Sequence, residues 1–184
     1  MNRLLNVKTI VATAIGAALF FVLGRFVAIP SPVPNTNISV QYGVLAFIAA
    51  LFGPVAGILA GLIGHFFIDF SQPWGIWWSW IIASGFFGLI MGIISFRLKL
   101  DDGEFGVKSI ILFNVSQIVA HAIAWIVIAP ILDIRIYAEA ANKVFAQGAV
   151  GALANSVTTA IVGTLLCIAY TTAIPKKGSL KEED

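Results

Sequence analysis

Long apolar runs, separated by short breaks, dominate this sequence. They cover about residues 9–28, 40–51, 55–70, 75–96, 109–129 and 142–173. Across the chain 59% of residues are hydrophobic and 11% are charged, and the mean hydropathy is +0.97. A soluble domain carries about 25% charged residues. If this chain folded in water, it would therefore expose a large apolar surface. The sequence therefore predicts an all-α membrane protein, a six-transmembrane-helix bundle.

Six spans and their connections use almost all of the 184 residues. We therefore predict a single transmembrane domain over residues 1–175 and a cytoplasmic tail over residues 176–184. The run from Thr9 to Ile29 is longer than the hydrophobic region of a signal peptide, so we interpret it as the first span. The second run, from Val40 to Leu51, is short for a bilayer core of ~30 Å and would need tilt or a contribution from the preceding loop.

Prolines mark several of the breaks. Three of them fall within residues 30–34, and because no helix continues through such a stretch, we predict a stiff loop there that could act as a lid. Residues 52–54, Phe-Gly-Pro, predict a tight turn, and residues 71–73 predict another break. Pro130 is predicted to end the fifth span, in front of a mixed loop that contains Asp133.

Six spans would place both termini on one side of the membrane, and the side richer in lysine and arginine is the cytoplasmic one. One side would carry Arg3, Lys8, Arg97, Lys99, Lys108, Lys176, Lys177 and Lys181. The other would carry Arg25, Arg135 and Lys143. Both termini are therefore predicted to be cytoplasmic, with the proline-rich loop outside.

Several function classes find no support in the sequence. No P-loop, nucleophile elbow or His-Glu-x-x-His motif is present, and a net charge of +2 is too small to indicate nucleic-acid binding. The single cysteine, Cys167, forms neither a disulfide nor a metal cluster by itself. These features predict that the chain is not an enzyme and that it has no metal site.

Polar side chains recur in the outer halves of the predicted spans, where burial in lipid is costly. His65 and Asp69 lie four residues apart and share a helix face, and Asp69 is the only acidic residue expected at membrane depth. The other polar positions in spans five and six are Asn114, Gln117, His121, Gln147, Asn155, Thr158 and Thr159. Hydrogen bonds between helices would explain them, but a polar cavity that opens outward satisfies all of them most simply.

Four tryptophans, Trp74, Trp77, Trp78 and Trp80, lie at the outer start of the fourth span. Tryptophan is enriched at membrane interfaces, so an aromatic belt is one interpretation. Four within seven residues cannot all face lipid, and a ring that points inward could stack on a planar ligand.

Small residues four positions apart occur twice in the first span, as Ala12 with Gly16 and as Ala14 with Ala18. Such pairs let a second helix approach closely in lipid. Packing against this protein's own helices and packing against a partner protein both remain open from the spacing.

The chain resembles the substrate-binding (S) components of energy-coupling factor (ECF) vitamin transporters. The resemblance covers nearly the whole chain and rests on its size, its six spans, the Ala14-x-x-x-Ala18 pattern and the turn at residues 52–57. Residues 23–26 and 34–38 are similar to a group of S components to which hydroxymethylpyrimidine, pyridoxine-like compounds and riboflavin have each been assigned as substrates.

The resemblance implies a substrate-specificity subunit in the bacterial plasma membrane, which works with a transmembrane coupling subunit and two cytoplasmic ATPases. Those partners would hydrolyse ATP, and this chain would need no cofactor. Ala14 and Ala18 would dock on the coupling subunit, and the loop at residues 30–37 would gate the pocket. The expected ligand contacts are Asn35, Asn37, Gln41, His65, Asp69, Trp77, Trp78, Gln117, His121 and Asn155. A stand-alone ion-coupled carrier, a small membrane enzyme and an assembly subunit are the alternatives.

Overall fold

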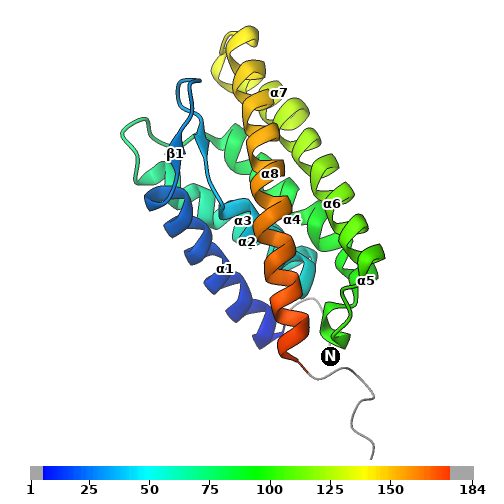
Figure 1. The fold of residues 1–184 in the computed structure, drawn as a ribbon. Helices are drawn as coiled ribbons and strands as arrows, with labels where there is room; N and C mark the ends of the chain where they lie inside the picture. Colours follow the sequence, from blue (N-terminus) through cyan, green and yellow to red (C-terminus); the bar gives the residue numbers. More distant parts are fainter. Residues whose placement is uncertain (1–5, 175–184) are drawn as a thin grey trace, which may run out of the picture.

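The computed structural model describes residues 6–174, which form a bundle of helices with one small β-hairpin (Figure 1). The predicted tail at residues 176–184 lies outside the described residues. In chain order the elements are α1 (Val7–Phe26), β1 (Ile29–Pro30), β2 (Asn37–Ile38), α2 (Gln41–Phe52), α3 (Pro54–Phe70), α4 (Trp78–Ile93), α5 (Ser95–Leu98), η1 (Leu100–Asp102), α6 (Val107–Ala122), η2 (Ile123–Ile128), α7 (Ala129–Tyr137) and α8 (Ala141–Ala173). The predicted all-α class is confirmed by this mostly helical fold.

Four helical segments are long and apolar enough to cross a membrane: Val7–Phe26, Trp78–Asp102, Val107–Tyr137 and Ala141–Ala173. The apolar helices α2 and α3 have only 12 and 17 residues, so the number of six spans remains a prediction. The start of α1 and the end of α8 lie at the same end of the bundle, and the hairpin lies at the opposite end (Figure 1). Which end faces the cytoplasm also remains a prediction.

The breaks between the first helices follow from local backbone chemistry. Gly53 has φ 88°, a conformation that glycine adopts at little cost. Pro54 is the first residue of α3, a position whose N–H has no partner within the helix, so proline loses no hydrogen bond there. This confirms the predicted tight turn. The proline-rich stretch is more ordered than a plain loop, because Ile29 pairs with Ile38 and Pro30 with Asn37 in an antiparallel hairpin.

The predicted end of the fifth span at Pro130 is wrong. The helical segment continues through Pro130 to Tyr137, and the stretch just before it, Ile123–Ile128, is π-helical. In these wide turns the N–H of Ala129 bonds to the carbonyl of Ala124, five residues back. A wide turn moves the preceding carbonyls away from the proline ring, so the clash that normally ends a helix is relieved. Asp133 therefore lies on a helix rather than in a loop.

The helices α3 and α4 meet backbone to backbone at two glycines. A β-carbon added to Gly57 would lie 2.2 Å from the carbonyl oxygen of Gly88, and one added to Gly88 would lie 2.1 Å from that of Gly57. Small residues are what allow such an approach in lipid. The side-chain core lies beside this contact and includes Leu45, Phe87 and Phe113, all fully buried.

Candidate ligand-binding site

A cavity of about 160 Å³ opens at the hairpin end of the bundle. Its walls come from the last turns of α1 and α3, from the first turns of α2 and α4, from the first half of α8, and from the hairpin, η2 and α7. A second hollow shares residues 35–37 with it and continues outward between the hairpin and the turn after α3, past Arg25 and Gln72. The cavity therefore has a mouth beside the hairpin.

Seven of the ten residues predicted to contact a ligand line this cavity. They are Asn35, Asn37, Gln41, His65, Asp69, Trp77 and Asn155. They come from the hairpin and from four different helical regions, so the fold gathers side chains that are up to 120 positions apart in sequence. This is the convergence of polar groups that the sequence predicted, although lining a cavity does not by itself test ligand contact.

The other three predicted residues do not line the cavity. Trp78 is half exposed, and its ring lies 5.9 Å from that of Phe66. Gln117 and His121 are fully buried between helices. The amide of Gln117 donates to the carbonyl of Ser156, 3.1 Å away on α8. Helical spacing placed these residues on the correct face of α6 but carries no information on how deep the cavity reaches.

The structure adds lining residues that were left out of the predicted site, among them Tyr42, Trp80, Trp125, Asp133, Lys143 and Gln147. Asp133 is only 2% exposed and lies in an apolar helical segment. The expectation that Asp69 is the only acidic residue at this depth is therefore wrong, because the helix continues through Pro130. The sequence could have predicted Trp125 as a lining residue from one feature: it follows His121 by four residues and so lies on the same helix face.

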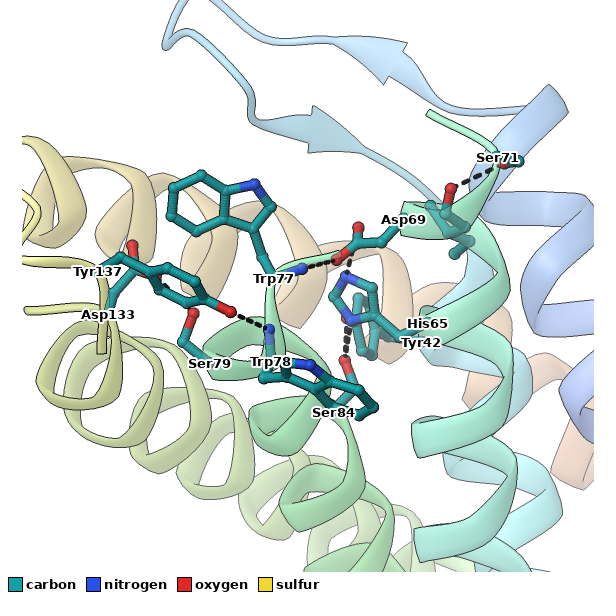
Figure 2. Close-up of polar contacts among 11 residues, drawn as sticks. Tyr42, His65, Asp69, Ser71, Trp77, Trp78, Ser79, Ser84, Asp133 and Tyr137 are labelled. Carbon is teal, nitrogen blue, oxygen red and sulfur yellow. Dashed lines mark hydrogen bonds and ion pairs between the residues drawn. The ribbon is translucent and has the colours of Figure 1, made fainter. Parts of the chain in front are cut away.

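A chain of polar contacts runs from Asp69 into the bundle (Figure 2). The backbone N–H of Trp77 donates to Asp69 Oδ2 at 3.0 Å, and Asp69 Oδ1 lies 3.7 Å from His65 Nε2. His65 Nδ1 bonds to the Ser84 hydroxyl, which is also 2.8 Å from the Tyr42 hydroxyl. Asp69 thus holds a backbone N–H at the start of α4 and orients His65 at the cavity wall.

This series of polar contacts contains a serine, a histidine and an aspartate, but it lacks an accessible nucleophile. Ser84 is fully buried and does not line the cavity. Nucleophilic catalysis needs the hydroxyl to reach the reacting carbon. The contacts instead connect α2, α3 and α4 below the cavity.

The opposite side of the cavity is fixed by α7. Asp133 accepts a hydrogen bond from the Ser79 hydroxyl, and the Tyr137 hydroxyl accepts one from the backbone N–H of Trp78 at 2.9 Å (Figure 2). The rings of Trp77 and Tyr137 lie 4.5 Å apart. The first turn of α4, which has no side-chain cap of its own, is therefore held from α3 and from α7.

His121 supports the aromatic wall of the cavity, formed by Trp80 and Trp125, from the side that faces away from the cavity. The indole N–H of Trp125 donates to His121 Nδ1 at 2.8 Å, and His121 Nε2 lies 3.1 Å from the Thr159 hydroxyl. Indole only donates, so Nδ1 is the acceptor and the ring proton of the neutral imidazole sits on Nε2. Trp125 in turn stacks on Trp80 with ring centroids 5.8 Å apart. His121 is therefore a positioning residue for the wall.

We expect His121→Ala to weaken ligand binding by roughly tenfold and to lower stability, because the indole N–H of Trp125 loses its buried acceptor. His121→Asn, whose amide oxygen can take the place of Nδ1, should recover most of the affinity. Affinity and the tryptophan emission maximum of the purified variants check this. Unchanged emission and affinity in His121→Ala would contradict the role.

The hairpin is held over the cavity by few contacts. At its tip the side-chain amide of Gln147 donates to the carbonyl of Pro34 at 2.9 Å. At its base the Thr158 hydroxyl donates to the carbonyl of Ser39 at 2.9 Å. Within the hairpin the N–H of Ser31 donates to the carbonyl of Thr36. The Ser39 hydroxyl also donates to the carbonyl of Leu23 on α1 at 3.4 Å. Contacts from α8 and α1 together therefore set the position of the hairpin.

The two small-residue pairs of α1 have different surroundings. Ala12 and Gly16 are buried, and Gly16 packs against Ile48 of α2. Ala14 and Ala18 are exposed on the outer face of α1, beside Ile15 and other exposed apolar side chains. The first pair explains how α1 packs inside the bundle, and the second leaves a smooth apolar strip on the outside.

A multi-pass helical bundle with a deep aromatic and hydrogen-bonding cavity at one end defines a solute-binding membrane protein. The family model for the ECF-type riboflavin transporter, S component, matches residues 4–172. The chain belongs to this family, whose members are transport proteins of the bacterial cell membrane and work with ECF transmembrane and ATPase modules.

Two relatives illustrate the similarity. A UPF0397 protein of Exiguobacterium sp. is 55% identical over 176 residues, which cover 96% of each chain. A UPF0397 protein of Staphylococcus aureus strain MSSA476 is 51% identical over 179 residues, or 97% of each chain. The similarity therefore extends over the whole bundle and is not confined to one motif.

Proposed function

We propose that this chain is the substrate-specificity subunit of an ATP-driven importer and binds a small water-soluble vitamin or vitamin precursor in the cavity at the hairpin end. The observation that carries the proposal is the cavity itself, in which four of the five tryptophans meet amide, imidazole and carboxylate side chains. Sites for small molecules combine apolar walls with a few convergent polar groups in this way.

The lining favours a planar, neutral or weakly cationic heterocycle. Trp77, Trp80 and Trp125 offer flat apolar faces. Lys143 is the one lysine or arginine among the described residues of the lining, and it already binds Glu139 at 2.7 Å. A multiply anionic ligand would need several cations. Hydroxymethylpyrimidine and pyridoxine-like compounds fit this chemistry, and riboflavin is the larger alternative.

In the proposed assembly the cavity faces outward and the ends of α1 and α8 face the cytoplasm. Lys8, Arg97, Lys99 and Lys108 lie in elements at the end of the bundle opposite the hairpin, in agreement with the positive-inside rule (Figure 1). Ala14 and Ala18 would dock on the transmembrane coupling subunit, which joins two ATPases. ATP would be hydrolysed by those partners, so this chain would need no cofactor.

The test is a titration of the purified chain in detergent with hydroxymethylpyrimidine, pyridoxine, riboflavin and thiamine, followed by tryptophan fluorescence. Because four tryptophans line the cavity, we expect the cognate compound to change the emission strongly at submicromolar concentration. Trp78→Phe is the matched control: this tryptophan lies outside the lining, and its removal should leave the response intact.

Two results would count against the proposal. Lack of response to every compound, in protein that remains folded, would remove the vitamin-binding role. Uphill uptake into liposomes that contain this chain alone would support the stand-alone ion-coupled carrier instead, because such uptake needs no ATPase partner.

A further inference from the structure

Two glycines, Gly24 and Gly151, are among the residues that line the cavity, and their surroundings differ. A β-carbon added to Gly24 would lie 1.9 Å from the side-chain oxygen of Gln41, so close packing requires a glycine there. A β-carbon added to Gly151 would meet nothing within 4 Å among the described residues outside its own stretch of helix, although Gly151 is buried. Gly151 therefore borders empty space inside the bundle.

The empty space beside Gly151 is the cavity. Gln147 and Asn155 lie about one turn before and one turn after Gly151 on α8, and both also line the cavity. Residues four apart share a helix face, so the three positions form one side of the site. Two of them carry amide side chains and the third carries none. The wall that α8 contributes therefore has a notch at Gly151, the space that a side chain at this position would fill.

A backbone contact fixes α8 beside this notch. A β-carbon added to Gly148 would lie 2.0 Å from the carbonyl oxygen of Trp125, so α8 packs directly against the backbone of η2. Trp125 lines the cavity and stacks on Trp80, so the aromatic wall is tied to the same contact. A side chain added at Gly151 would therefore reduce the cavity volume of about 160 Å³ instead of pushing α8 away from the wall.

We propose that Gly151 determines the size of the ligand that the cavity accepts, because part of the bound molecule occupies the notch. The inference rests on the proposed function of the cavity and adds a specificity-determining residue to it. Closely packed sites do not take up additional atoms without strain. Each carbon added at position 151 excludes ligand atoms from the notch, so affinity falls in steps with the size of the side chain. The fall is steepest for the largest ligand.

The experiment measures Kd in detergent for hydroxymethylpyrimidine, pyridoxine, riboflavin and thiamine, with the unmodified chain, Gly151→Ala and Gly151→Leu. For a compound that binds the unmodified chain, we expect a loss of affinity of roughly tenfold or less in Gly151→Ala and of roughly 100-fold in Gly151→Leu. If two compounds bind, the larger one should lose more affinity in each variant.

Thermal unfolding of the ligand-free variants supplies a readout that separates exclusion of the ligand from misfolding. The added side chains enter open space, and alanine and leucine are both better helix formers than glycine. The Tm of both variants should therefore equal or exceed that of the unmodified chain, although both bind ligand more weakly. Ala149→Leu is the matched control, because Ala149 is exposed on the same helix and lies outside the lining. It should leave every affinity unchanged.

The outcomes distinguish this inference from the proposed function. Affinity in Gly151→Leu within about threefold of the unmodified chain would overturn the size-determining role and leave the vitamin-binding role in place. Equal losses in Gly151→Leu and Ala149→Leu would also overturn it, since added bulk anywhere on α8 would then be the cause. So would a lower Tm of ligand-free Gly151→Leu, because the notch would then not be open space. If the folded, unmodified chain binds none of the four compounds, both proposals fail together.

Discussion

Replacing Ala14 and Ala18 together with phenylalanine is expected to abolish uptake in cells while the purified chain keeps its affinity for the ligand. Both alanines are exposed on the outer face of α1, so larger side chains there need not disturb the interior. They would prevent a partner helix from approaching closely, which is what small residues permit in lipid. Uptake of radiolabelled substrate by cells that also express the ECF module, together with binding in detergent, measures the two effects separately.

The control places the same change on exposed alanines elsewhere. Ala122 on α6 and Ala169 on α8 are also exposed, and their joint replacement by phenylalanine should leave uptake intact. Loss of binding and uptake to the same degree in the α1 variant would contradict a docking role. Equal loss of uptake in both double variants would indicate that any added bulk on the bundle surface is harmful.

Gly57→Ala is expected to destabilise the bundle strongly, because its β-carbon would meet the carbonyl oxygen of Gly88 at 2.2 Å. Backbone atoms cannot move aside as a flexible side chain can, so α3 and α4 would have to separate. A cost near the upper end of ~1–3 kcal/mol for overpacking corresponds to a fall in Tm of roughly 6–12 °C for a chain of this size. Thermal unfolding of the ligand-free protein in detergent measures it.

Gly151→Ala is the opposite case on another helix. A β-carbon at Gly151 would have nothing within 4 Å among the described residues, and alanine is the better helix former by about 1 kcal/mol. This variant should unfold at the same temperature as the unmodified chain or at a higher one. Similar Tm values for Gly57→Ala and Gly151→Ala would show that α3 and α4 are not in backbone contact.

Sequence patterns located the helices well because apolar runs and their breaks are local. The last span was predicted at residues 142–173 and the helix covers Ala141–Ala173. The turn at Gly53 could likewise be predicted from Gly53 and Pro54 alone. Pro130 was misleading for a physical reason: a proline normally ends a helix, and only the wide turns before it, which depend on tertiary packing, make the continuation possible.

The site was partly predictable for the same reason. The spacing of His65 and Asp69 placed both on one face of a helix, and both line the cavity. Spacing cannot reveal which buried polar residue meets the cavity and which meets a neighbouring helix. His121 and Asn155 were equivalent in the sequence, yet one is bonded to Trp125 behind the wall and the other borders the cavity without a partner for its oxygen.

The π-helical stretch Ile123–Ile128 also sets the rotational phase of everything that follows it. Trp125 and Asp133 are eight residues apart, which in a regular α-helix would turn them about 80° away from each other. A wide turn accommodates one additional residue, equivalent to about 100° of rotation, and so brings both onto the cavity side. Deletion of one residue from this stretch would restore a regular helix and rotate Asp133 away from Ser79. The deletion or insertion of a single residue in this stretch can thus change which residues of α7 face the cavity, without any substitution of the side chains that line it.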